Sequence, residues 1–169
     1  MLLSTYCRQL QSHRPHSFLG LMELYEENYI RLRRLCPDIR VRRGAAVSVV
    51  AGALDLHLDV LEQTSYTTTV RLTYILTELA HQPVPDPDLK LRVYHDARQA
   101  EVLSRACRRR GVELSVRDLT GRSELLCRWK LNRFLYKWLG YCCHQRHHFT
   151  PDEGAGKLSP VGSVARRGS

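Results

Sequence analysis

The spacing of apolar residues changes period along this chain, and the change limits the folds that it can adopt. In residues 18–36, apolar side chains recur every three or four positions, which is the spacing of one face of an α-helix. Ser17 can cap the start of this helix, and Pro37 ends it. In residues 54–61, by contrast, apolar and polar residues alternate, and this period is typical of a half-buried β-strand. The chain must therefore combine an amphipathic helix with a sheet.

Further strands follow. Residues 64–79 are rich in Thr, Tyr, Val and Ile, which favour strands, and the polar residues 63–65 indicate a hairpin turn before them. Residues 89–96 alternate again, and residues 112–119 suit a fourth strand. Three prolines and two aspartates in residues 81–88 predict a loop.

Two segments complete the pattern. Residues 97–111 are ambiguous, since their alanines and glutamate suit a helix that Gly111 can end. Residues 122–142 form a second clear helix, whose apolar stripe ends with Tyr141 and Cys142 in the core. The sequence predicts an α+β fold: an N-terminal helix, an antiparallel sheet of about four strands and a C-terminal helix, with the helices packed on one sheet face.

The chain of 169 residues, 43% of them hydrophobic, has enough apolar material for one core. We expect a flexible extension over residues 1–16, a single α+β domain over 17–149 and a disordered tail over 150–169, where Gly, Ser and Pro dominate. No run approaches the ~18 apolar residues of a membrane span. The scattered cysteines suit a reducing compartment, so the predicted location is the cytoplasm.

Charge is distributed unevenly along the chain, whose formal net charge is +9. Acidic side chains outnumber basic ones by 8 to 4 in residues 44–104. Basic side chains outnumber acidic ones by 8 to 4 in residues 1–43 and by 11 to 3 in residues 105–149. This asymmetry favours an anionic partner or, equally well, basic flanks that pack against an acidic middle.

The basic flank supplies the candidates for a binding surface. Its arginines and lysines suit contacts with the phosphates of nucleic acid or the carboxylates of an acidic protein. The alternative is a solvated basic helix face, and no known nucleic-acid-binding motif occurs in the sequence. The predicted binding residues are Arg92, Tyr94, Arg108, Arg109, Lys130 and Arg133.

Three residues near the end of the third predicted strand are candidates for catalysis: His95, Asp96 and Glu101. Because side chains alternate along a strand, His95 and Asp96 cannot form a pair unless the strand ends between them. A histidine at a strand end, oriented by a carboxylate such as Glu101, can act as a general base. The sequence favours the alternative, in which Asp96 caps the next segment and His95 makes a hydrogen bond in the core.

The stretch YCCHQRHHF (residues 141–149) combines two cysteines with three histidines. If the helix continues, Cys143 with His147 and His144 with His148 each place two metal ligands on one face. A structural zinc needs four ligands, usually from two short-spaced pairs, and no second pair lies in a segment that we expect to be ordered. The sequence therefore favours a polar helix end whose histidines trail into solvent, and it predicts no metal and no cofactor.

Four blocks together resemble the YqiB family of short bacterial cytoplasmic proteins, which has no assigned activity. The resemblance covers residues 17–143 and implies a bacterial origin and an α+β fold, but no catalytic residue. The blocks are YEENYIRLRRLCP (25–37), QTSYTTTV (63–70), RVYHDARQAEV (92–102) and LNRFLYKWLGYC (131–142).

Two functions follow as hypotheses. The first is a binding or accessory module whose basic C-terminal flank meets nucleic acid or an acidic protein. The second is a small hydrolase or transferase that uses His95 with a nearby carboxylate. The sequence favours the first, because no activated nucleophile accompanies His95.

Overall fold

The computed structural model describes residues 16–76, 83–107, 112–115 and 122–151. The predictions for residues 1–16 and 150–169 therefore lie almost entirely outside the described residues. The elements, in chain order, are α2 (Phe18–Leu35), β1 (Ala45–Ser48), β2 (Leu56–Gln63), β3 (Thr67–Leu76), β4 (Val84–Tyr94), β5 (Gln99–Cys107), β6 (Val112–Ser115) and α3 (Arg122–His144).

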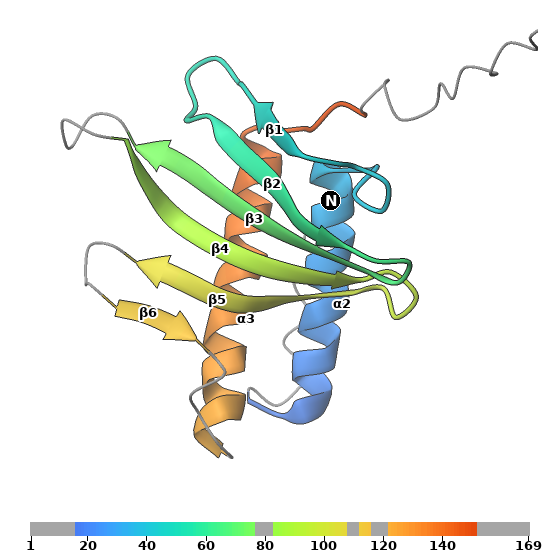
Figure 1. The fold of residues 1–169 in the computed structure, drawn as a ribbon. Helices are drawn as coiled ribbons and strands as arrows, with labels where there is room; N and C mark the ends of the chain where they lie inside the picture. The colour runs from blue at the N-terminus through green and yellow to red at the C-terminus, as the bar shows by residue number, and fades with distance from the viewer. Residues whose placement is uncertain (1–15, 77–82, 108–111, 116–121, 152–169) are drawn as a thin grey trace, which may run out of the picture.

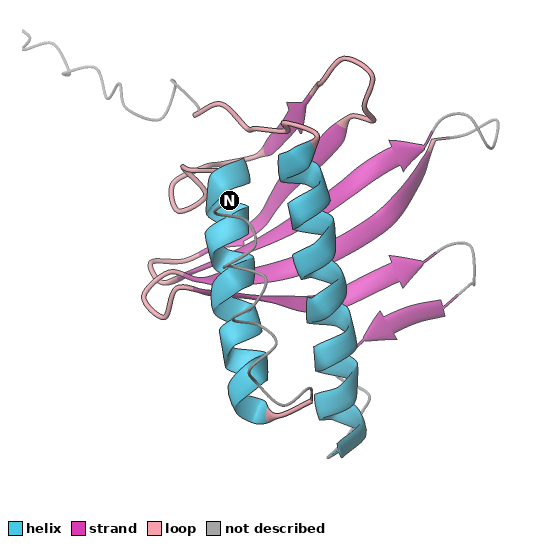
Figure 2. Cartoon of the chain, turned by 180° about the vertical axis from the view of Figure 1, so that it is seen from behind, coloured by secondary structure: helices cyan, strands magenta, loops and turns pink. Residues whose placement is uncertain are grey.

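The strands form one sheet in the order β1-β2-β3-β4-β5-β6, and every neighbouring pair is antiparallel (Figure 1). Both helices lie side by side on one face of this sheet (Figure 2). The predicted α+β class, with helices on one sheet face, is confirmed. The sheet has six strands rather than about four, because the short β1 and the ambiguous segment that forms β5 add to those predicted.

β5 and the start of β4 show where tertiary context overrides local sequence. Residues 99–107, which suit a helix by composition, pair instead with residues 88–94 of β4. The predicted proline loop already belongs to β4 from Val84 onward. Prolines cannot donate to a ladder, and the register of β3 with β4 shifts between Thr73 and Ile75, opposite these prolines.

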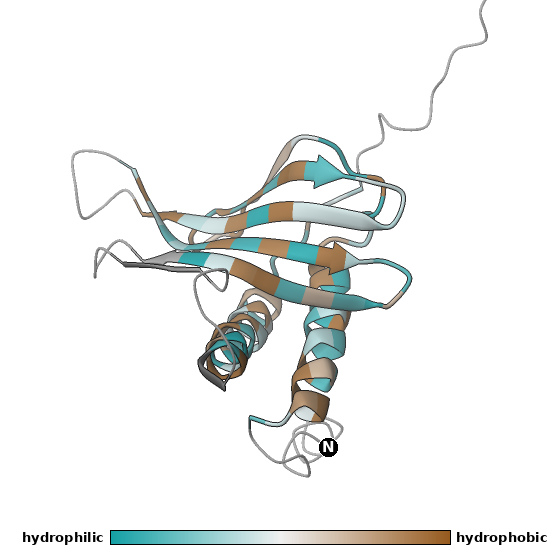
Figure 3. Cartoon of the chain, turned by 60° about the horizontal axis from the view of Figure 1, so that its bottom comes forward, coloured by the Kyte–Doolittle hydropathy of each residue, from teal (hydrophilic) through white to brown (hydrophobic). Residues whose placement is uncertain are grey.

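The core lies between the sheet and the helix pair. Alternate residues of the strands point into it, and Figure 3 shows this alternation of apolar and polar positions along the strands. Both helices close the core with their apolar stripes. Its largest fully buried side chains are Leu21, Leu32, Leu35, Ile39, Leu56, Leu58, Leu72, Leu89, Leu91, Leu135, Leu139 and Phe149.

The two helices run parallel to each other. Contacts between them advance in the same direction along both: Trp129 with Ser17, Asn132 with Asn28, and Tyr136 with Arg31. Both N-termini therefore lie at one end of the domain and both C-termini at the other. Neither helix has, within its described residues, the length and apolar character required to cross a membrane.

The end of α3 corrects two expectations. Tyr141 is 52% exposed, so the predicted core stripe ends with Cys142 alone. After the helix, Arg146 adopts a left-handed backbone (φ 66°), and the amide of His147 donates to the carbonyl of Cys142 at 3.1 Å. This Schellman turn redirects the chain. His147 and Phe149 consequently enter the core instead of trailing into solvent.

Candidate functional site

A stripe of basic side chains runs along the exposed side of α3. Lys130, Arg133 and Lys137 are all exposed and recur at the three-and-four spacing of one helix face. The opposite side of the same helix is buried against the core through Leu131 and Leu135. We call these three cations the basic stripe. It contains two of the predicted binding residues.

The other predicted binding residues lie elsewhere. Arg92 and Tyr94 belong to β4, where Nε of Arg92 lies 3.5 Å from the hydroxyl of Thr69. The hydroxyl of Tyr94 donates to Oε1 of Glu101 at 2.7 Å. The structure thus separates Arg92 and Tyr94 from the basic stripe, and Arg108 and Arg109 lie outside the described residues.

Two further arginines of the basic flank have internal partners. The guanidinium carbon of Arg105 stacks 3.6 Å from the centroid of the Phe134 ring, a cation–π contact. Arg128 forms ion pairs with Glu101 and Glu124. Neither arginine extends the basic stripe as a free cation.

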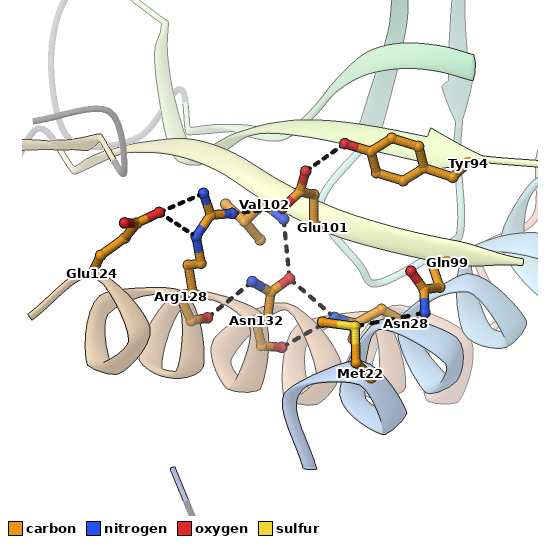
Figure 4. A network of polar contacts seen from close by, with 9 residues as sticks. All are labelled: Met22, Asn28, Tyr94, Gln99, Glu101, Val102, Glu124, Arg128 and Asn132. Atoms are coloured by element: carbon orange, nitrogen blue, oxygen red, sulfur yellow. Dashed lines mark hydrogen bonds and ion pairs between the residues drawn. The ribbon is translucent and has the colours of Figure 1, made fainter. Parts of the chain in front are cut away.

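Arg128 is the centre of a polar network that joins α3 to β5 (Figure 4). Its Nε and Nη2 atoms donate to Oε1 of Glu124 at 2.9 and 2.8 Å, and its Nη1 atom donates to Oε2 of Glu101 at 2.9 Å. The hydroxyl of Tyr94 donates a hydrogen bond to the other carboxylate oxygen of Glu101, a residue that is 8% exposed. We call this set the Arg128 network.

A second polar contact lies one helical turn further along. Oδ1 of Asn132 accepts the backbone N–H of Val102 at 3.0 Å, and Nδ2 of Asn28 donates to the backbone carbonyl of Asn132 at 3.3 Å. Both asparagines are fully buried. This contact therefore ties both helices to β5.

Tyr25 of α2 also reaches the Arg128 network. Burial, and then the negative charge of Glu101, raise its pKa to about 12. Burial and the hydrogen bond to Glu101 likewise raise the pKa of Tyr94. Burial opposes the charge of Arg128, but its hydrogen bonds to Glu124 and Tyr25 raise its pKa overall. At neutral pH both phenols are therefore protonated donors rather than nucleophiles.

The three candidate catalytic residues occupy separate environments. His95 is 5% exposed, its Nε2 lies 2.8 Å from the hydroxyl of Thr68, and its backbone N–H donates to the carbonyl of Tyr66, just before β3, at 2.9 Å. Asp96 is exposed and lies 3.9 Å from Arg40. Both oxygens of Glu101 are engaged in the Arg128 network. The structure does not bring these three side chains together.

Burial, and then the positive charge of Arg40, lower the pKa of His95. The imidazole is therefore neutral at physiological pH and sits in the core, where the alternative interpretation of the sequence placed it. The structure does not place Asp96 or Glu101 against the ring of His95, so a catalytic role for His95 remains a prediction.

The four candidate metal ligands also point to different partners. Sγ of Cys143 contacts the carbonyl of Arg31 at 4.0 Å, and His144 is exposed. Nδ1 of His147 lies 3.1 Å from the hydroxyl of Ser48, and Nδ1 of His148 lies 3.3 Å from a carbonyl of α2. Within the described residues, no group of three or more His, Cys, Asp or Glu side chains is arranged to hold a metal ion.

The sequence signals only part of the Arg128 network. Glu124 and Arg128 have the i,i+4 spacing of a helical ion pair, which is visible in the sequence. The involvement of Tyr25 and Glu101 depends on how α2 and β5 pack against α3, so no local pattern reveals it.

Comparison with known proteins adds three findings. A family model described as a protein of unknown function (DUF1249) matches residues 31–148, which include the basic stripe and the whole Arg128 network. Proteins named "Uncharacterized protein YqiB" from Escherichia coli K12 and from E. coli O157:H7 are each 32% identical over 128 residues, covering 74% of this chain and 87% of the relative. No solved structure matches.

Proposed function

We propose, for a chain that belongs to the DUF1249 family of proteins of unknown function, a role as a binding module for an anionic partner. The basic stripe of α3 is the binding surface, and the phosphate backbone of a nucleic acid is the partner that suits it best.

The observation that carries this proposal is the unpaired state of the stripe. Within the described residues, no ion pair joins Lys130, Arg133 or Lys137 to a carboxylate, whereas Arg42, Arg71 and Arg128 are each paired with one. Arg71 forms two hydrogen bonds to Asp88, at 2.7 and 2.6 Å, and is one example. Three unpaired cations on a rigid helix offer an anion full charge without first breaking an internal contact.

The spacing of the stripe suits a phosphate backbone. The helical rise of about 1.5 Å per residue separates Lys130 from Arg133 by ~4.5 Å and Arg133 from Lys137 by ~6 Å along the axis. Beyond Lys137, the exposed Tyr141 and His144 continue the same face. An aromatic side chain in line with cations favours nucleic acid over an acidic protein, because bases stack on aromatic rings.

The test is fluorescence anisotropy with a labelled single-stranded oligonucleotide at ~50 mM salt. The triple variant Lys130→Ala, Arg133→Ala, Lys137→Ala removes the stripe. A matched variant, Arg34→Ala, Arg43→Ala, Lys90→Ala, removes the same charge from exposed positions elsewhere. We expect the stripe variant to lose binding and to lower the slope of log K against log salt by about 2, and the matched variant to change both less.

Two outcomes would count against this proposal. Equal losses in both variants would reject the stripe as the binding surface, because binding would then follow net charge. Absence of binding by the unmodified protein at ~50 mM salt would leave an acidic protein as the anionic partner to examine. The hydrolase or transferase alternative through His95 gains no support from the geometry and stays a prediction.

A further inference from the structure

We propose that a cavity at the N-terminal ends of the two helices is a second binding site, whose ligand is a small organic cation with an apolar body. The cavity has a volume of about 310 Å³ and lies between α2, α3 and β5. Pockets that hold small organic molecules begin at about this size. It is separate from the basic stripe, which follows the exposed side of α3.

One wall of the cavity is apolar. It consists of Leu21 and Met22 from α2, Leu125 from α3, and Phe18 at the start of α2. Phe18 is 68% exposed and borders the mouth of the cavity. This wall can bury the hydrocarbon part of a ligand.

The facing wall consists of Tyr25 and of the three charged members of the Arg128 network, Glu101, Glu124 and Arg128. Three charged side chains are partly withdrawn from water here, and such a group costs desolvation energy that apolar residues of similar volume would avoid. The network therefore serves the cavity as well as the packing of α3 against β5.

The hydrogen-bond acceptors that line the cavity indicate the charge of the ligand. Oε1 of Glu124 accepts both bonds from Arg128, while Oε2 accepts none among the described residues and belongs to a side chain that is 34% exposed, so a ligand can reach it. Glu101 and Glu124 together outweigh the single charge of Arg128. A carboxylate oxygen without a donor, in a cluster with a net charge of about −1, attracts an ammonium or amidinium group.

The helix dipoles oppose this balance. Both helices begin at the cavity, and each N-terminus carries about half a positive charge, so the two together offset a side-chain charge of about −1. The preference for a cation therefore rests on Oε2 of Glu124, a carboxylate oxygen that can only accept hydrogen bonds and that an ammonium group can reach as a donor.

The test uses three probes of one shape: 2-phenylethylamine as the cation, 3-phenylpropionate as the anion and 2-phenylethanol as the neutral form. Each is titrated into the ¹⁵N-labelled full chain while backbone amide shifts are followed. We expect the amine to shift the amides of Leu21, Tyr25 and Leu125 saturably, and the anion to shift them little. Glu124→Gln keeps the size of the side chain and should weaken amine binding about ten-fold.

Glu26→Gln is the matched control, since Glu26 is exposed on α2 and its replacement changes the net charge equally. It should leave amine binding unchanged, as should the triple stripe variant. This last comparison separates the present inference from the proposed function. Equal or tighter binding of 3-phenylpropionate, unchanged amine affinity in Glu124→Gln, or no saturable shift up to ~10 mM amine would each overturn the proposal.

Discussion

Asn132 of α3 accepts the backbone N–H of Val102 of β5 through its side-chain oxygen, at 3.0 Å, inside the core. β6 pairs with β5 over residues 104–107, so this amide lies beyond the end of that ladder. A buried amide without a partner costs free energy, and the helix supplies the acceptor that a neighbouring strand would otherwise provide.

Replacing Asn132 with Ala should therefore lower the free energy of unfolding by about 2–3 kcal/mol, because the Val102 amide loses its acceptor and a small cavity forms. Asn28→Ala removes a contact to Asn132 but leaves Val102 satisfied, so its cost should be smaller. Urea unfolding of both variants measures the difference. Equal costs would show that the Val102 bond contributes little.

Arg128→Met should destabilise the protein by about 2–4 kcal/mol, since it leaves the carboxylate of Glu101 without its cation. The double variant with Glu101→Gln should recover part of this loss, because the remaining neutral amide is cheaper to bury. Glu124→Gln alone should cost less than about 1 kcal/mol, as that ion pair is partly exposed. A double variant less stable than Arg128→Met would contradict the interpretation.

Acidification should weaken the fold through two histidines. Burial lowers the pKa of His95 and of His147. As pH falls, the histidines of the unfolded chain therefore take up protons before those of the folded protein do. The stability that is present above the ordinary histidine pKa of about 6.5 is lost as pH falls toward the lowered pKa values of the folded state.

The groups facing these rings do not reverse this direction. At His95, the positive charges of Arg40 and Arg33 lower the pKa further, and the opposing effect of Asp96 is weaker. At His147, the hydrogen bond to Ser48 and the charge of Asp55 raise the pKa, but they only partly offset the effect of burial. Unfolding free energies between pH 5 and pH 8 should fall toward the acidic end, and His147→Gln should flatten the slope. A slope that stays the same in this variant would exclude His147 as a source.

Arg146→Gly should stabilise the protein by about 0.5–1 kcal/mol, because Arg146 adopts φ 66° and glycine enters this conformation without a steric penalty. Arg146→Ala is the matched control, since it removes the charge but keeps the strain. Thermal unfolding of both variants separates the two effects. A comparable gain in the alanine variant would assign it to charge instead of backbone conformation.

Phe149→Ala should cost about 3–5 kcal/mol, because the side chain of Phe149 is 2% exposed and packs in the hydrophobic core. Tyr141→Ala should change stability by less than about 0.5 kcal/mol, since the ring is largely solvated. Chemical unfolding of the two variants checks whether the segment after α3 belongs to the core. Similar costs would contradict the described helix end.

The elements that local periodicity specifies were predicted well. The helix expected over residues 18–36 is observed as Phe18–Leu35, and the alternating segment after Leu54 becomes β2. In both cases the side of the element that is apolar is also the side that is buried, so the pattern itself contains the information. β5 was missed as a strand, because its pairing with β4 is not encoded in its own composition.

The candidate site divides in the same way. The basic stripe and the Glu124–Arg128 pair follow from helical spacing, which any sequence displays. The position of Glu101 and Tyr25 beside Arg128, and the separation of His95 from Glu101, follow from strand register and from the parallel packing of the helices.

The sequence by itself thus determined the positions of both helices, the strands with clear alternation and the basic character of α3. Only the tertiary structure decided that His147 and Phe149 enter the core, that Tyr141 stays in solvent, and that a charged network borders a cavity. The physical reason is the distance along the chain over which each kind of information acts. Periodicity is local and indicates which side of an element is buried. A site requires groups that are distant along the chain to lie within hydrogen-bond distance of one another.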